Sequence, residues 1–340
     1  MNILVTGGAG YIGSHNVIAL LEAGYNVIIF DNLELGHIET VNTLKNLNTK
    51  GSVIDFVEGN LMILQDVESV FAKHEIDAII HFAAYSQVAE SVKEPQKYYY
   101  NNVLGTLNLL NTAMEYDVKK IVFSSTAATY GEPVYTPIDE KHPQKPINTY
   151  GKTKLMIEKI MEDYDTAYGL KSVRLRYFNV AGADSQNRVG EWHNPETHLI
   201  PNILKSTFNN GKVFQMFGTD YDTKDGTCVR DYINVEDLAQ AHLLALKYLI
   251  NGGETNYFNL GTNEGSSVKE VFEVCEKVTG KKIPVERKPR RAGDPAILIA
   301  DNKKAKEILG WNPVKTLEDS IQTAYNWEIE LAKKLSNQVK

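Results

Sequence analysis

The fold of this chain is decided by residues 1–15, MNILVTGGAGYIGSH. The first six, mostly apolar, predict a buried strand, and a helical pattern runs from Ser14 to Ala23. Between them Gly7, Gly10 and Gly13 form the spacing G-x-x-G-x-x-G. Glycines at these places permit a tight turn and let the backbone approach a pyrophosphate, which the helix N-terminus attracts. The stretch therefore predicts a dinucleotide-binding turn.

A second strand is expected over residues 25–30, and it ends at Asp31. An acidic side chain at that point accepts hydrogen bonds from adenosine ribose hydroxyls and repels a 2′-phosphate, which favours NAD over NADP. A glycine turn that serves packing alone is the alternative interpretation. A phosphate loop of the NTPase kind is excluded because no Lys-Ser/Thr pair follows the glycines.

Tyr150 and Lys154 have the spacing Y-x-x-x-K, and the hydroxyl cluster Ser124, Ser125 and Thr126 precedes them. Positions four apart share a helix face, so the lysine ammonium can favour the ionised form of the phenol and make it a usable base. A surface helix can carry such a pair without function. Here an apolar run, residues 121–123, predicts a strand that delivers the hydroxyls to its carboxyl end, where open α/β sheets bind ligands. Together these features predict a hydride-transfer site.

Strand-like and helix-like segments alternate through the first half of the chain. This alternation predicts an α/β fold with a Rossmann-type, doubly wound parallel sheet. After about residue 179 loops and short elements dominate, which indicates a second, smaller α/β lobe for the substrate. The expected strands are residues 3–6, 27–30, 54–58, 78–83, 121–124 and 173–177.

Composition excludes several classes of function. With 340 residues the chain can form two lobes, and a net charge of −7 offers no attraction to nucleic acid or membrane surfaces. Two cysteines do not support a disulfide framework, and neither a signal peptide nor a membrane span is expected. We therefore expect a cytoplasmic protein. His193, Glu196 and His198 are possible metal ligands, but they lack helical His-x-x-x-His spacing, so no metal site is expected.

Six stretches of this chain resemble the UDP-glucose 4-epimerases, which belong to the extended short-chain dehydrogenase/reductases. The resemblance covers about residues 1 to 330. It implies a domain that binds NAD over residues 1–179, a return of the chain at about 232–261, and a domain over 180–340 that mainly binds the UDP-sugar. The stretches that carry it are residues 7–15, 31–33, 124–127, 150–154, 176–179 and 229–232.

The reaction that the resemblance implies is reversible epimerisation of UDP-glucose and UDP-galactose at C4, which serves galactose metabolism and UDP-sugar supply. It proceeds through a 4-keto intermediate with tightly bound NAD. Tyr150 would remove the 4-hydroxyl proton, Thr126 would bond the 4-oxygen, and Lys154 would bind the nicotinamide ribose and lower the phenol pKa. The family also implies a homodimer that pairs through residues 90–116 and 150–168.

The resemblance transfers two sets of binding residues to this chain. The cofactor set is Gly7, Gly10, Tyr11, Ile12, Gly13, Asp31, Asn32, Asn60, Leu61, Phe82, Ala83, Ala84, Ser86, Asn101, Ser124, Tyr150, Lys154, Tyr177 and Phe178. The UDP-sugar set is Thr126, Asn179, His198, Leu199, Gln215, Phe217, Arg230, Tyr232, Arg291, Asp294 and Leu298. Two arginines in the second set suit a pyrophosphate because guanidinium groups form bidentate, charge-assisted bonds.

This chain departs from the family pattern at four of these positions. Asn60 replaces a common aspartate, Ser86 a lysine, and His198 an asparagine, while Leu298 stands where some members carry a tyrosine beside the sugar. The shorter Leu298 leaves space for an N-acetyl group, so activity on UDP-N-acetylglucosamine is also expected.

Three other functions compete with epimerisation. A nucleotide-sugar dehydratase needs an Asp-Glu pair beside the hydroxyl position, where this chain has Ala127 and Ala128. A UDP-uronate decarboxylase is a further relative with the same scaffold. A catalytically silent NAD(H) sensor would not need Thr126, Tyr150 and Lys154 together.

Overall fold

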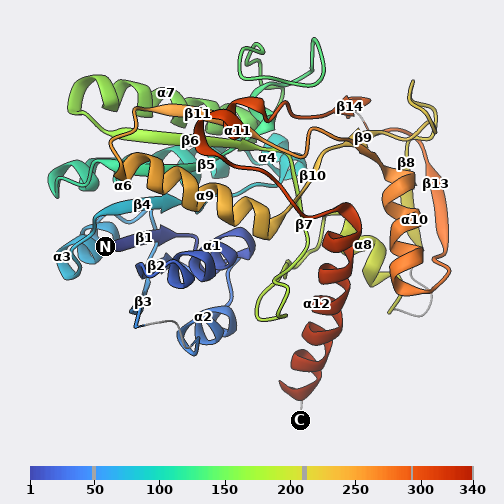
Figure 1. The fold of residues 1–340 in the computed structure, drawn as a ribbon, viewed down its shortest axis with the longest axis horizontal. Coiled ribbons are helices and arrows are strands. Elements are labelled where there is room, and N and C mark those ends of the chain that lie inside the picture. The colour runs from blue at the N-terminus through green and yellow to red at the C-terminus, as the bar shows by residue number, and fades with distance from the viewer. Residues whose placement is uncertain (48–50, 209–212, 292–293, 339–340) are drawn as a thin grey trace.

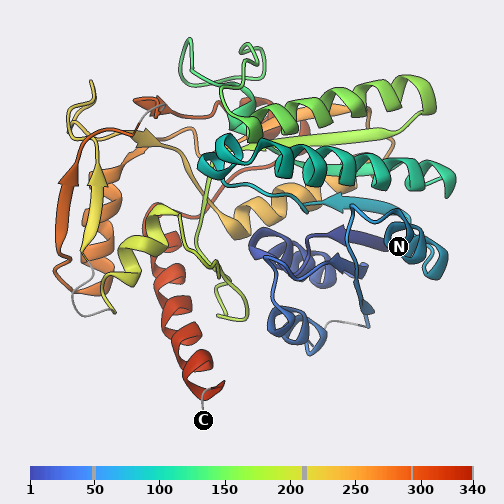
Figure 2. The same cartoon turned by 180° about the vertical axis from the view of Figure 1, so that it is seen from behind.

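The structure is a computed structural model that describes residues 1–47, 51–208, 213–291 and 294–338. A large lobe with a central sheet lies beside a smaller lobe, and the last helix runs along their junction (Figures 1 and 2).

In the described part of the chain the central sheet has seven strands in the order β11-β6-β5-β4-β1-β2-β3, and neighbouring strands pair in parallel. This confirms the predicted doubly wound sheet. Its order reverses at β1, where β2 lies on one side and β4 on the other. The strands are β1 (Asn2–Thr6), β2 (Asn26–Asp31), β3 (Ile54–Glu58), β4 (Ala78–His81), β5 (Lys120–Thr126), β6 (Lys171–Tyr177) and β11 (Asn256–Leu260).

Two apolar cores lie on opposite faces of this sheet, because alternate strand residues point to opposite sides. Ile3 and Val5 belong to one core, and Leu4 belongs to the other. The first core includes residues of α1 (Tyr11–Glu22), α2 (Ile38–Lys45), α9 (Val235–Ile250) and α11 (Lys303–Leu309). The second includes residues of α3 (Leu64–Lys73), α6 (Gly105–Glu115) and α7 (Thr149–Tyr168).

A chain of short turns connects β4 to α6 on the second face. It consists of α4 (Val88–Lys93), α5 (Pro95–Tyr98) and the π-helical turn η1 (Tyr99–Leu104), and a 3-10 turn, η2 (Ala127–Thr129), follows β5. π-Helical turns concentrate at functional sites, and this one carries Asn101 of the cofactor set.

The smaller lobe has a core of its own between short sheets and three helices. Its helices are α8 (Leu199–Lys205), α10 (Val268–Thr279) and α12 (Leu317–Gln338). Its strands are β7 (Asn179–Ala181), β8 (Phe214–Phe217), β9 (Val229–Arg230), β10 (Tyr232–Asn234), β12 (Ser266–Ser267), β13 (Val285–Lys288) and β14 (Ile297–Leu298). Between these strands the chain returns to the large lobe, where β11 pairs with β6 and α9 and α11 join its core.

Some element boundaries differ from the expected ones for local reasons. Helix α1 begins at Tyr11 rather than at Ser14, because the extended residue Gly10 already ends the turn. Strand β4 ends at His81, since the N–H groups of Phe82 and Ala83 both donate to the Thr6 carbonyl and the chain leaves the ladder.

Candidate active site

The glycine loop after β1 is shaped so that side chains would not fit. Gly7 has φ of +73°, and a Cβ there would lie 2.6 Å from the Ala83 nitrogen. A Cβ at Gly13 would lie 2.1 Å from the Gly7 carbonyl oxygen. Helix α1 begins at the N-cap Gly10 without a side-chain cap, so its first N–H groups can face an anion. The loop therefore fits a dinucleotide pyrophosphate.

Asp31 closes this loop from the end of β2. Its side chain is 7% exposed, and its two oxygens accept the N–H groups of Ala9 at 3.0 Å and Leu33 at 2.9 Å. Burial raises the pKa of this carboxyl, and the two backbone N–H groups oppose that rise. Each oxygen keeps acceptor capacity, as a ribose diol requires. The bond from Ala9 ties the acid to the glycine loop, a link that sequence spacing alone did not show.

The remaining cofactor set follows the carboxyl ends of the same parallel strands. Because the strand order reverses at β1, these segments flank the point where such sheets form their ligand-binding crevice. Asn32 follows β2, Asn60 and Leu61 follow β3, Phe82, Ala83, Ala84 and Ser86 follow β4, Ser124 lies in β5, and Tyr177 and Phe178 end and follow β6. Ser86 is exposed, and Asn60 uses its side-chain oxygen to accept the Met62 N–H at 2.9 Å.

Tyr150, Lys154 and Thr126 are brought together where α7 meets the end of β5. Asn148 caps α7 by accepting the Gly151 N–H at 2.8 Å, so the helix starts at Thr149 and places Tyr150 in its first turn. The Thr126 hydroxyl hydrogen-bonds the Tyr150 phenol. Lys154 is 1% exposed, donates to the Ser124 carbonyl at 2.8 Å, and lies 5.9 Å from the centre of the Tyr150 ring.

The electrostatics of this triad differ from the expectation. Burial raises the pKa of Tyr150 to about 12, although the bond from Thr126 acts in the opposite direction. Burial also lowers the pKa of Lys154 to about 7, which Glu158 partly opposes. Lys154 is not among the groups that shift the phenol pKa, so the expected lowering by its ammonium does not appear here. An oxidised nicotinamide ring is cationic and would add the charge that favours phenolate.

A buried ion pair between Glu158 and Arg176 lies next to the triad, and sequence analysis did not predict it. Glu158 is 0% exposed, and its carboxylate accepts Arg176 Nε at 2.9 Å and Ser125 Oγ at 2.5 Å. Glu158 lies one turn beyond Lys154, so the spacing Y-x-x-x-K-x-x-x-E was the available signal. The ion pair ties β6 to α7, and the bond from Ser125 ties the end of β5 to the same helix.

Apart from Thr126, which lies on β5 of the central sheet, the UDP-sugar set lies on separate short elements and loops of the smaller lobe. Arg230 on β9 pairs in register with Leu298 on β14, and its guanidinium lies 3.8 Å from the Asp294 carboxylate. Arg291 stacks over Phe217 at 4.1 Å, measured to the ring centre. The other members are Gln215 on β8, Tyr232 on β10, which pairs with Asn179 on β7, and Leu199 at the start of α8.

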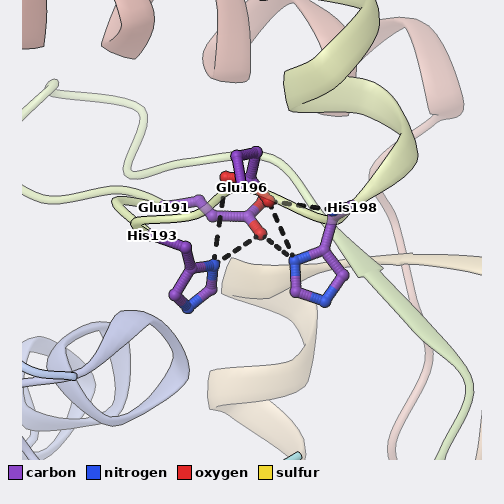
Figure 3. A group of neighbouring side chains, drawn as sticks. All are labelled: Glu191, His193, Glu196 and His198. Carbon is purple, nitrogen blue, oxygen red and sulfur yellow. Dashed lines mark hydrogen bonds and ion pairs between the residues drawn. The ribbon is translucent and has the colours of Figure 1, made fainter. Parts of the chain in front are cut away.

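His198 is placed differently from the rest of its set. Its Nδ1 lies 2.5 Å from the Glu191 carboxylate and 3.3 Å from that of Glu196 (Figure 3). Glu191 raises the pKa of His198 to about 10, against the effect of burial. Its backbone N–H donates to Glu196 and its carbonyl accepts from Asn202, so its second ring nitrogen is the group that remains for a substrate.

Comparison with known proteins identifies the family of this chain. The family described as GDP-mannose 4,6 dehydratase matches residues 4–324. A UDP-glucose 4-epimerase of Halalkalibacterium halodurans is 54% identical over 97% of this chain and 96% of its own length. The chain belongs to the UDP-glucose 4-epimerase family.

Two solved structures of this family are similar throughout. The UDP-glucose 4-epimerase of Bifidobacterium longum, in complex with NAD+ and UDP, has a TM-score of 0.92 at 40% identity and covers 97% of this chain and 98% of its own. The UDP-Glc/GlcNAc 4-epimerase of Campylobacter jejuni has a TM-score of 0.84 at 42% identity, with coverage of 97% and 99%. In the described residues, no helix of this epimerase-family chain is long and apolar enough to cross a membrane.

Proposed function

We propose that this chain is an NAD-dependent UDP-glucose 4-epimerase, which interconverts UDP-glucose and UDP-galactose. The observation that carries the proposal is the position of Thr126, Tyr150 and Lys154 beside the crevice of a dinucleotide sheet. Relatives of this name align over nearly the whole chain. NAD would be held by the cofactor set, and when bound it supplies the hydride acceptor at the sugar C4.

The protein groups have distinct tasks in this reaction. The Tyr150 phenolate takes the proton of the 4-hydroxyl as the C–H bond breaks, and it returns the proton when the hydride comes back to the other face. Thr126 donates to or accepts from the same 4-oxygen and fixes its position. Lys154 orients the ribose of the cofactor and contributes positive charge near the phenol. The UDP-sugar set, with Arg230 and Arg291 at the pyrophosphate, holds the nucleotide while the keto sugar rotates.

A dehydratase is the competing activity, because the matching family model bears that description. Elimination of water needs an acid and a base beside Thr126. The chain has Ala127 and Ala128 there, in the short turn η2, and neither can transfer a proton. This observation favours epimerisation.

One incubation separates these activities. Purified protein would be given UDP-galactose, UDP-N-acetylgalactosamine and, as the dehydratase substrate, GDP-mannose, and products would be separated by chromatography. We expect UDP-glucose from the first and no 4-keto-6-deoxy sugar from the last. Accumulation of the deoxy product without any UDP-glucose would overturn the proposal.

We also propose that the chain divides near residue 179 and works in the cytoplasm as a homodimer through α6 and α7. Supporting this surface, Leu104 beside α6 and Met156 on α7 are 39% and 48% exposed, so both segments offer an apolar side chain to a partner. Light scattering on wild type and Met156→Glu tests it. A monomeric wild type would contradict the dimer.

A further inference from the structure

Four side chains with metal-binding atoms converge in the loop between β7 and α8. They are Glu191, His193, Glu196 and His198, and one ligand atom from each lies within 4.8 Å of the others (Figure 3). His193 Nδ1 is 3.2 Å from Glu191 Oε1, and His198 Nδ1 is 3.3 Å from Glu196 Oε1. In a tetrahedral zinc site with bonds of about 2.1 Å, neighbouring ligand atoms are about 3.4 Å apart. The His193–Glu191 and His198–Glu196 separations match that spacing, whereas His198 Nδ1 lies 2.5 Å from Glu191 Oε1 and would move away from it when a metal binds.

Glu196 provides a second and independent indication. Its side chain is 5% exposed. Its Oε1 accepts the N–H groups of Thr197 at 2.8 Å and His198 at 2.9 Å, whereas its buried Oε2 has no hydrogen-bond partner. The groups near Oε2 are His193 Nδ1 at 3.9 Å and Lys205 Nζ at 3.6 Å. A buried carboxylate oxygen without a short contact is costly, and a bound cation would remove that cost.

The charge of the surroundings also favours a cation. Glu328 of α12 is 8% exposed and lies 3.7 Å from Lys205, so a third carboxylate adjoins Glu191 and Glu196. The aromatic ring of Tyr11 packs against His193 from the side of the glycine loop. Lys205 supplies one positive charge between Glu196 and Glu328, and protonated imidazoles or a metal ion can balance the remaining carboxylates.

We propose that Glu191, His193, Glu196 and His198 bind one divalent transition-metal ion of the zinc class. Two imidazole nitrogens and two carboxylate oxygens form a mixed donor set that suits such an ion. The expectation from sequence was that no metal binds, because the ligands lack helical spacing. They come instead from an irregular loop whose turns bring them together.

The contacts of this loop with both lobes indicate the role of the ion. Four protein ligands complete a tetrahedral shell, so the site would be structural rather than catalytic. Trp192 stacks on His37 with ring centres 3.7 Å apart, and the Glu191 carbonyl accepts Trp327 Nε1 of α12 at 2.9 Å. His198 itself is the N-cap residue of α8. The ion would therefore hold the glycine-loop side of the large lobe against α8 and α12 of the smaller lobe.

The test uses the full chain with its own bound nucleotide. Metal content is measured by mass spectrometry after purification, and chelator-treated protein is titrated with ZnCl2 alone and, for its visible spectrum, with CoCl2. Variants Glu196→Gln and His193→Gln remove one ligand each. The matched control is His74→Gln, whose ring faces the Asp55 carboxylate at 3.4 Å in the large lobe.

We expect one zinc per chain, a Co2+ spectrum of a tetrahedral site, and a higher Tm with metal. Each ligand variant should weaken zinc binding by at least about 100-fold, since even loss of a group behind a ligand costs about 10–100-fold. His74→Gln should bind as wild type. Absence of zinc uptake by wild type, or uptake unchanged in both ligand variants, would overturn the proposal. The wild-type Co2+ spectrum remains decisive if a variant does not fold.

Discussion

The crevice of the central sheet and the smaller lobe are built in different ways. At the crevice, the glycine loop, Asp31 and Tyr150 each follow a regular strand or start a helix, and the backbone fixes where they point. In the smaller lobe, Arg230 and Leu298 lie on two-residue strands that meet from distant parts of the chain. Substitutions at the crevice should therefore change the chemistry and the cofactor, and those in the smaller lobe should change substrate binding.

The largest effect is expected for Tyr150→Phe. The variant loses the proton acceptor but keeps the ring, so kcat should fall by about 100-fold to 10,000-fold while NAD stays bound. The measurement is turnover of UDP-galactose together with NAD released by acid.

Tyr164→Phe is the matched control for this substitution. It makes the same chemical change on the same helix, where the phenol donates to Asn111 at 2.6 Å on the surface. Near-normal turnover by a folded Tyr150→Phe protein would contradict the mechanism.

Arg230→Met tests the other side of the comparison. If the guanidinium binds the pyrophosphate, its loss removes a charge-assisted bond of about 1.5–3 kcal/mol, so KM should rise by roughly 10-fold to 100-fold with NAD retained. Arg290→Met, which breaks the 2.8 Å pair with Asp220 in the same lobe, should leave KM unchanged. An equal rise of KM in both variants would show that positive charge in this lobe attracts the substrate without a specific contact from Arg230 to the pyrophosphate.

Asp31→Ser should change cofactor choice rather than substrate affinity. Removal of the carboxylate ends the repulsion of a 2′-phosphate, while a hydroxyl can still accept one of the two backbone N–H groups. We expect the ratio of NADP to NAD affinity to rise by about 10-fold, because one charge contact of about 1.4 kcal/mol corresponds to that factor. Reconstitution of the stripped protein with each nucleotide measures it. An unchanged ratio would mean that Asp31 does not face the ribose.

The central sheet could be predicted from the sequence because the sequence signals for its elements are local. Strand, glycine turn, helix and acid follow one another within residues 1–31, and each can be predicted from its own few residues. The Y-x-x-x-K pair likewise needs only a helix to share a face. The pair Glu158 and Arg176 was missed because its partners come from α7 and β6, and only the parallel pairing of β5 with β6 brings them together.

The loop of residues 190–198 shows the opposite case. Its four ligand atoms have no periodic spacing, and the stacking of Trp192 on His37 helps to fix its path from another lobe. Sequence patterns detect periodic faces and short motifs, whereas such convergence depends on tertiary contacts. For the same reason, the residues of the UDP-sugar set could be predicted only from the resemblance to the family.

The smallest effect is expected for Leu298→Tyr, and it concerns substrate choice within the smaller lobe. Leu298 and Arg230 are partners in a parallel pair, so their side chains leave the same face of the sheet. If Arg230 holds the pyrophosphate, Leu298 then lies toward the sugar. The half-buried leucine leaves room that a tyrosine ring would fill, and burial of an acetamido methyl contributes about 1 kcal/mol.

We therefore expect wild type to epimerise UDP-N-acetylglucosamine as well as UDP-glucose, as the relative from Campylobacter jejuni is named for doing. Leu298→Tyr should lower kcat/KM for the acetylated sugar by about 5-fold to 10-fold, since about 1 kcal/mol corresponds to that range, and should spare UDP-glucose. Leu298→Met, which conserves volume, is the control and should behave as wild type. A wild type that turns over UDP-galactose but no acetylated sugar would show that other walls close the pocket. Equal losses on both sugars in Leu298→Tyr would instead indicate that the side chain contacts the nucleotide. The smaller lobe would then not select the sugar through this residue.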